Sequence, residues 1–265
     1  MTVEHINKQI YDKQFENDER ELMYNLLIEG KLKKMKRLTT GFEGRVLDVG
    51  CGNCWSSQLF AGARVEHFGI DISDNALKRA QKKGVTVKKV DLDADPIPFE
   101  DNSFDLVLCS DIIEHTLYPE NILKEARRVL KESGSLIVVV PNIASWFNRI
   151  LVLFGYFPWG IESTGSLELK DVFFHWNTGH MHIYTKKSII SLLELTGFKP
   201  EHCLGAHLNV SSVMEQCVNL RDELMADKKC PLFLLKLFTV IGNFYALFPS
   251  LATEIIVKAQ KNLKL

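Results

Sequence analysis

From Arg45 to Asn142 the chain alternates short runs of β-branched and aliphatic residues with stretches of helical periodicity. Such alternation is typical of a parallel sheet whose strands are connected by helices. We therefore predict an α/β fold. The predicted strands are RVLDVG, VEHFGID, VTVKKVD, FDLVLCSD and SLIVVVPN, with TEIIVKAQK near the C-terminus as a last strand.

Two of the connecting segments carry helix signals. SDNALKRAQKKG offers Ser73 or Asp74 as the N-cap and Gly84 as the terminator. PENILKEARRVLKESG carries helix signals of the same kind, with a proline in its first turn. We expect helices over both segments.

The remaining regions are interpreted as parts of one domain, 1–265, because the sequence shows no internal repeat and no low-complexity linker. Residues 1–41 form an N-terminal helical region, in which KLKKMKR is expected to be the solvated face. The strand and helix core covers 42–142. Residues 143–180 are expected to be an insertion or lid over the sheet, and 208–250 an apolar helical segment before the last strand.

Two stretches are large, aromatic and apolar: SWFNRILVLFGYFPW and the tail segment from Leu232 to Phe248. The tail segment contains Lys236 and is bounded by Pro231 and Pro249, so it is shorter than the roughly 20 apolar residues that a membrane crossing needs. Both stretches are compatible with a peripheral membrane contact, with the roof of an apolar pocket or with a lid that packs on the sheet.

The overall composition excludes some partners. A net charge of -1 gives no global attraction to nucleic acid, which is not an expected partner. The polar N-terminus lacks the apolar core of a signal peptide, so the prediction is a cytoplasmic protein, peripheral to the membrane at most. Cys51 and Cys54 have no second CxxC half in the sequence, which disfavours a structural zinc site.

The turn after the first predicted strand, RVLDVGCGNCWSSQL, is shaped to hold a ligand. Gly50 and Gly52 allow a tight turn and a close backbone approach. A dinucleotide fingerprint would place a third glycine where this chain has Trp55, and Asp48 would repel a pyrophosphate. The turn therefore favours a ligand that carries positive charge.

These residues resemble a family. VLDVGCG is similar to the first motif of class I S-adenosylmethionine-dependent methyltransferases, of the type 11/23-like group, and FGIDIS resembles the second strand of that family. VDLDADPIPFEDNSFDLVLCSDIIEH and EARRVLKESGSLIVVVPN continue the likeness over about residues 42–142, with Glu132 and Ser133 standing where the family usually has proline and glycine. The resemblance implies a Rossmann-like doubly wound, mostly parallel seven-stranded sheet with an antiparallel last strand, helices on both faces and helical insertions.

The same resemblance implies S-adenosylmethionine as the cofactor and assigns its contacts. Asp71 would accept hydrogen bonds from both ribose hydroxyls while Ile72 packs on the adenine. Asp91 with the Leu92 amide would meet the adenine amino group, and Asp93 competes with Asp91 for this role. The full set of expected cofactor-binding residues is Asp48, Gly50, Cys51, Gly52, Asp71, Ile72, Asp91, Leu92, Asp93, Ser110 and Asp111.

The chemistry places small demands on the protein, because the sulfonium supplies the driving force and the protein mainly aligns the acceptor. A hydroxyl acceptor would need a base, and His115, His180 and His182 are the candidates because of their near-neutral ordinary pKa. The alternative is that Glu114 and His115 only fix the loop after the fourth strand. No metal is expected, although Asp111, Glu114 and His115, with His180, resemble the acid-x-x-Glu-His cluster of metal-dependent methyltransferases.

The expected function is methyl transfer to a small-molecule, lipid-linked or glycan acceptor, at oxygen, in line with a likeness to uncharacterised prokaryotic methyltransferases of cell-surface glycan or lipid pathways. A non-catalytic S-adenosylmethionine-binding regulator or scaffold stays open, because the transfer needs no indispensable nucleophile. The interpretation as an NAD-dependent oxidoreductase is disfavoured by Trp55. The interpretation as a metal-dependent RNA methyltransferase is supported only by the resemblance to the metal cluster. The sequence predicts neither the identity of the acceptor nor the oligomeric state.

Overall fold

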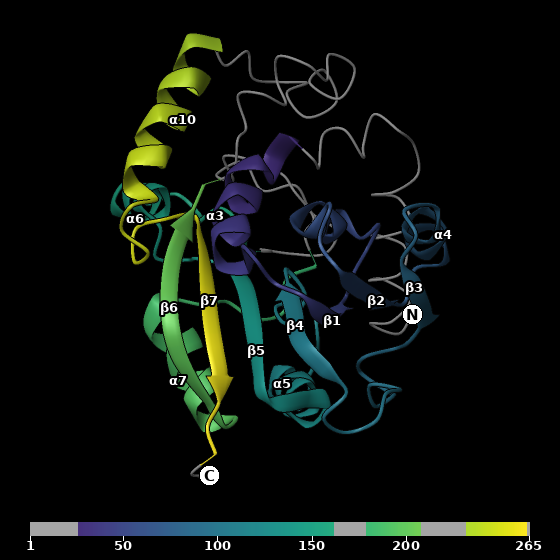
Figure 1. Cartoon of the computed structure of the whole chain (residues 1–265). Coiled ribbons are helices and arrows are strands. Elements are labelled where there is room, and N and C mark those ends of the chain that lie inside the picture. Colours follow the sequence, from purple (N-terminus) through teal and green to yellow (C-terminus); the bar gives the residue numbers. More distant parts are fainter. Residues whose placement is uncertain (1–25, 162–178, 208–231, 264–265) are drawn as a thin grey trace.

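A computed structural model describes residues 26–161, 179–207 and 232–263 (Figure 1). Predictions that fall on 1–25, 162–178 and 208–231 lie outside the described residues.

The centre of the molecule is one seven-stranded sheet with strand order β3-β2-β1-β4-β5-β7-β6. The first five strands are parallel, and β7 is antiparallel to both of its neighbours, so the predicted sheet is confirmed. The strands are β1 (Gly44–Val49), β2 (Val65–Asp71), β3 (Thr86–Lys89), β4 (Phe104–Ser110), β5 (Leu130–Pro141), β6 (Phe198–Ala206) and β7 (Glu254–Lys261).

Helices cover both faces of the sheet, as expected. On one face the core includes Ile122 and Leu123 of α5 (Pro119–Val129) and Ile189 of α7 (Lys186–Leu195). On the other face Met35 of α3 (Glu29–Thr39) and Leu59 of η1 (Trp55–Phe60) pack on β1, β4 and β5. The central strands are buried on both faces, which explains why β4 and β5 consist of nearly continuous apolar runs.

The helix signals were correct at the N-terminal ends. In α4 (Asp74–Lys82) the N-cap is Ser73, whose side chain accepts a hydrogen bond from the Ala76 amide at 3.2 Å. Gly84 follows the helix with φ +79°, a conformation that glycine adopts without strain. The prediction that the next helix continues to residue 134 was wrong: α5 ends at Val129, and Leu130 takes an extended conformation that begins β5.

The range of β6 was not among the predicted strands. Its sequence, FKPEHCLGA, contains Pro200 and a run of polar residues that hide the strand pattern. Such a strand is tolerated because β6 is an edge strand that pairs only with β7, and the register shifts between Pro200 and His202.

The expectation that KLKKMKR is a solvated face was wrong for part of this segment. Lys31 is 2% exposed and Met35 is fully buried, because this side of α3 lies on the sheet. Lys33, by contrast, points to solvent and pairs with Glu29 one turn earlier at 2.7 Å.

The two apolar stretches meet at one corner of the molecule. Helix α6 (Trp146–Leu153) follows β5, and α10 (Leu232–Tyr245) precedes β7. The Trp146 ring stacks on Tyr245 with centroids 5.4 Å apart. Figure 1 shows α10 extending beyond the end of β6. Within the described ranges, no helix combines the length and apolar character that a membrane crossing requires.

Candidate functional site

The predicted site residues gather at the carboxyl ends of the parallel strands. The sheet order reverses direction between β1 and β4, because β2 and β3 lie on one side of β1 while β4 and β5 lie on the other. In doubly wound sheets, ligands bind at the carboxyl ends of the strands beside this switch point. Asp48 in β1 lies next to Gly69 of β2 and Leu108 of β4, so it sits in the sheet at this switch point.

The turn after β1 depends on its glycines. Gly50 and Gly52 have φ values of +67° and +52°, and Cys54 shares this left-handed conformation at +52°. A Cβ atom on Gly50 would lie 2.5 Å from the Ile112 side chain, so the turn and the loop after β4 approach each other too closely for any side chain here. Trp55, at the position of a third fingerprint glycine, begins η1, and its side chain is buried in the core.

Asp71 links this turn to the next helix. Its carboxylate accepts hydrogen bonds from the Gly52 amide and the Ser73 amide, each at 2.8 Å. The residue is 8% exposed and ends β2. One side chain therefore fixes the geometry of two backbone segments that border the switch point.

Asp48 is a buried acid with a raised pKa. The Ser56 hydroxyl donates to its carboxylate, and the Cys54 thiol lies 3.9 Å from the same oxygen. Burial raises the pKa of Asp48 to about 7, although the Ser56 hydrogen bond acts in the opposite direction. Cys51 is buried beside this group, and its Sγ lies 2.7 Å from where a Cβ on Gly69 would be, so its thiol packs against β2.

The loop after β3 is tied to the loop after β4. Asp91 accepts a hydrogen bond from the Asp93 amide at 3.0 Å, and Asp93 accepts one from the Leu117 amide at 2.7 Å. Asp93 therefore joins the two loops, whereas Asp91 shapes its own turn. Both acids stay candidates for the adenine contact. Ile72 and Leu92 are half-buried, and Leu92 packs against the core.

The end of β4 carries an ion pair that sequence reasoning missed. Asp111 has φ +54°, accepts a hydrogen bond from the Ser110 hydroxyl at 3.1 Å and pairs with the Lys31 ammonium. Lys31 also contacts Glu254 at 2.7 Å, and burial raises the pKa of Glu254 to about 7. The N-terminal helix is thereby bound to the ends of β4 and β7. No sequence pattern signals this contact, because its members are 80 or more residues apart.

Glu114, His115 and His180 form a second cluster, in which one potential metal-binding atom from each side chain lies within 4.8 Å of the others. Glu114 is 1% exposed, and neither of its carboxylate oxygens has a hydrogen-bond partner among the described residues. Burial, with a smaller contribution from the Asp111 charge, raises the pKa of Glu114 well above its usual range. Of the four residues that resemble a metal cluster in the sequence, Glu114, His115 and His180 lie together, whereas Asp111 pairs with Lys31.

The three candidate histidines lie in different environments. His115 is 8% exposed, and its Nδ1 donates to the Gly179 carbonyl at 3.2 Å. Burial lowers the pKa of His115 to about 3, with the neighbouring His180 acting in the same direction. His180 is half-buried and donates from Nδ1 to the Gly160 carbonyl at 2.7 Å. His182 lies 3.3 Å from the Leu117 carbonyl.

Another group with ligand-type atoms is Asp48, Cys54 and His67. The Ser56 hydroxyl lies between these side chains, since it donates to Asp48 and is 3.4 Å from Nε2 of His67. Burial lowers the pKa of His67 to about 4, so its imidazole is neutral at pH 7. The Ser56 hydroxyl thus provides a hydrogen-bonding contact to Asp48 and to His67 without a cation.

The residues present fit S-adenosylmethionine better than a dinucleotide. The glycines of the left-handed turn have no side chains that cover the backbone at the end of β1. The acids Asp48 and Asp71 border this turn. An ionised carboxylate has about four acceptor positions, so two amide bonds to Asp71 are compatible with a ribose hydroxyl. The short 3₁₀ helix that begins with the buried Trp55 gives no close-packed phosphate site.

Comparison with known proteins agrees with this geometry. A methyltransferase domain model matches residues 47–138. A demethylmenaquinone methyltransferase of Listeria welshimeri is 31% identical over 57% of this chain and 77% of its own length. An uncharacterised protein of Methanocaldococcus jannaschii is also 31% identical, over 53% of this chain and 62% of its own. The chain spans about half to three-fifths of the length of the first curated relatives it matches.

Solved structures share the whole fold. An S-adenosylmethionine-dependent methyltransferase from Thermotoga maritima aligns over 96% of this chain and 99% of its own, with a TM-score of 0.58 and 20% identity. The fold, the matched domain and the identity to curated relatives agree. The chain belongs to the class I family of S-adenosylmethionine-dependent methyltransferases.

Proposed function

We propose that this protein binds S-adenosylmethionine at the carboxyl edge of the sheet and transfers its methyl group to a small-molecule or lipid-linked acceptor. The observation that carries the proposal is the junction at Asp71, whose carboxylate holds the Gly52 and Ser73 amides beside the switch point. The chain is proposed to act as one domain, with 143–180 as an insertion beside the site.

Each end of the cofactor has a proposed partner. Asp71 would hold the ribose hydroxyls beside Ile72, and Asp91 or Asp93, with Leu92, would meet the adenine. Asp48 and the Gly50 to Gly52 turn would line the methionine end, where a carboxylate suits the positive ligand. When bound, the cofactor supplies an electrophilic methyl group on a good leaving group, so these residues bind and orient rather than react.

We assign the proton-accepting role to His180 rather than His115. A general base works best with a pKa near the working pH, and a pKa of about 3 makes His115 a weak base. His115 instead lies against His180, with ring centroids 4.7 Å apart, and helps to fix its orientation. His182, bonded to the Leu117 carbonyl, is proposed to hold the same loop.

The acceptor is proposed to be a hydroxyl-bearing small molecule, lipid-linked compound or glycan, methylated at oxygen. The relative from Listeria welshimeri is named as a methyltransferase of demethylmenaquinone, which is a quinone. This name supports an acceptor of the small-molecule or lipid-linked class. The chain carries no excess of positive charge, which supports an acceptor other than nucleic acid.

A metal-assisted version of this reaction has one observation in its favour. A buried carboxyl group without a hydrogen-bond partner is costly, and within the part of the chain that the structure describes Glu114 is such a group, beside two imidazoles. Glu114, His115 and His180 are therefore the residues that would hold a divalent ion. Such an ion would lower the pKa of an acceptor hydroxyl.

The test is calorimetric titration of the purified protein with S-adenosylmethionine and, separately, with NAD, first with a chelator and then with added magnesium. We expect binding of S-adenosylmethionine alone and in both buffers. Binding of NAD instead would overturn the proposal, and binding only after metal addition would favour the metal-assisted version. Turnover is then measured by mass spectrometry of quinone, glycan and lipid-linked acceptors. Cofactor binding with no methylated product across the panel would favour a regulator or scaffold.

A further inference from the structure

Asp48 is a buried acid at one end of a chain of hydrogen-bonding side chains. Its Oδ2 atom accepts a hydrogen bond from the Ser56 hydroxyl, and the Ser56 Oγ atom lies 3.4 Å from Nε2 of His67. Asp48 is 3% exposed, whereas His67 is only half-buried. The chain therefore leads from β1, through η1, to a side chain of β2 that lies nearer to solvent.

The His67 end of the chain is a neutral imidazole. Burial lowers the pKa of His67 to about 4, and the ring meets the Phe60 ring edge-on with centroids 5.6 Å apart. In a neutral imidazole one ring nitrogen carries a proton and the other a lone pair. With its proton on Nδ1, His67 accepts a hydrogen bond from Ser56 at Nε2.

The Ser56 hydroxyl has one hydrogen, so it donates to only one of its two neighbours at a time. When Asp48 is ionised, Ser56 donates to the carboxylate. When Asp48 is protonated, the carboxyl group donates to the Ser56 oxygen, and Ser56 donates to Nε2 of His67. The direction of one hydroxyl group thus depends on whether Asp48 carries a proton.

The surroundings of Asp48 favour its protonated form until a cation arrives. Burial raises the pKa of Asp48 to about 7, and the charges of Asp71 and Asp111 act in the same direction. An adjacent cation reverses this balance, because it attracts the ionised carboxylate. The titratable and charged groups that face Asp48 from the surrounding elements are His67 and Asp71 of β2, Cys51 and Cys54 of the turn, Cys109 of β4, and Asp111 after β4, which is paired with Lys31 of α3.

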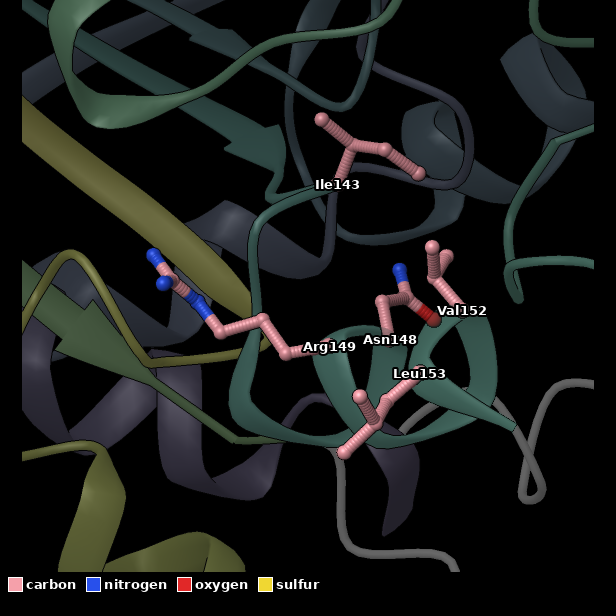
Figure 2. Close-up of a pocket in the computed structure, with 5 residues that line it drawn as sticks. All are labelled: Ile143, Asn148, Arg149, Val152 and Leu153. Atoms are coloured by element: carbon pink, nitrogen blue, oxygen red, sulfur yellow. The ribbon is translucent and has the colours of Figure 1, made fainter. Parts of the chain in front are cut away.

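The hollow drawn in Figure 2 lies elsewhere in the molecule. Its volume is about 370 Å³, and its lining residues all follow β5, on α6 or just before it: Ile143, Asn148, Arg149, Val152 and Leu153. None of these five residues belongs to β1, η1 or β2, so this hollow gives Asp48 no path to solvent. Within the described residues, the printed contacts of Asp48 lead instead to Ser56 and His67.

We propose that binding of S-adenosylmethionine expels a proton from Asp48 and that this proton leaves through Ser56 and His67. The Asp48 carboxyl group gives its proton to the Ser56 oxygen, Ser56 gives its own hydrogen to Nε2 of His67, and the imidazolium releases a proton to solvent from Nδ1. The product is an ionised Asp48 that accepts from Ser56 and faces the positively charged cofactor. This inference rests on the proposed function, because it places the cofactor at the turn after β1.

The first test is calorimetric titration with S-adenosylmethionine at pH 6 and at pH 8, each in two buffers of different ionisation enthalpy. The dependence of the heat on the buffer gives the number of protons released. We expect about one proton at pH 6 and close to none at pH 8, with an affinity about tenfold weaker at pH 6, because Asp48 is mostly protonated there. Asp48→Asn should remove the proton release. The control is Glu43→Gln, at an exposed acid just before β1, which should release as many protons as the unaltered protein.

The second test needs no ligand. Nitrogen NMR of the labelled protein follows Nε2 of His67 against pH, and the spectrum of His67→Gln assigns this signal. We expect an inflection near pH 7, besides the titration of the imidazole itself near pH 4. Asp48→Asn and Ser56→Ala should each remove the inflection near pH 7.

Binding of S-adenosylmethionine without proton release at pH 6, or a release that persists in Asp48→Asn, would overturn the expulsion of the proton. An inflection near pH 7 that persists in Ser56→Ala would overturn the route. No binding at either pH would contradict the proposed function together with this inference, whereas binding without proton release would contradict this inference alone.

Discussion

At the residue scale, the candidate site depends on buried acids with different environments. Asp71 accepts two backbone amide hydrogen bonds, whereas Asp48 has one hydroxyl donor and a pKa of about 7. An acid that ionises near neutral pH can change its protonation when a cationic ligand binds.

Replacement of Asp71 tests the cofactor contact. Asp71→Ala is expected to weaken S-adenosylmethionine binding by about 1.5 to 3 kcal/mol, because two charge-assisted hydrogen bonds are lost. The Asp71→Asn variant keeps the side-chain volume. Its affinity for S-adenosylmethionine should lie between that of the unaltered protein and that of the Asp71→Ala variant. Isothermal titration calorimetry measures both, with circular dichroism as the check on folding. An unchanged affinity in the alanine variant would contradict the placement of the ribose.

The pKa of Asp48 predicts a pH dependence of stability. Between about pH 4 and pH 7 the folded protein keeps a proton on this carboxyl group that the unfolded chain has lost, so this group lowers the free energy of unfolding as pH rises. Asp48→Asn removes this titration. Its free energy of unfolding relative to the unaltered protein should rise across this window, by up to about 4 kcal/mol.

Urea denaturation at a series of pH values measures the Asp48→Asn difference. Asp95→Asn, at an exposed acid in the loop after β3, is the control for the substitution itself. A pH-independent difference for Asp48→Asn would show that its carboxyl group has an ordinary pKa.

At the element scale, the position of α3 depends on one lysine. The Lys31 ammonium lies between Asp111 and Glu254, which belong to different strand ends, and its alkyl chain is buried. The ammonium also lies 5.9 Å from the Trp55 ring centroid. This contact joins α3 to the segment that carries the candidate site.

Lys31→Met is expected to destabilise the protein by about 3 to 5 kcal/mol, because it leaves the buried Glu254 and the half-buried Asp111 without their cation. Lys33→Met on the exposed face of the same helix removes only a surface pair and should cost less than about 1 kcal/mol. Urea denaturation at neutral pH compares the two. Equal effects would contradict the role of the buried ion pair.

At the scale of the whole molecule, the family fold predicts a response to the cofactor. A ligand at about 100 times its dissociation constant stabilises the folded state by about 2.7 kcal/mol. For a chain of this size, that corresponds to a rise in Tm of roughly 5 to 10 °C. Differential scanning calorimetry with S-adenosylmethionine and with NAD measures this, and an equal rise with both ligands would contradict the proposed specificity.

The sequence by itself determined the strands β1 to β5 and β7, the glycine turn and the acids at the strand ends, because these features depend on local periodicity and on turn residues, whereas the doubly wound seven-stranded sheet was expected only from the family resemblance. The edge strand β6 was missed, because its burial pattern is set by its partner and not by its own sequence. Only the tertiary structure could show that Lys31 is buried, that burial lowers the pKa of His115 to about 3, and that His180 lies beside Glu114 while Asp111 pairs with Lys31. The physical reason is that burial and charge pairing are produced by contacts between residues far apart in the chain, which no local pattern records.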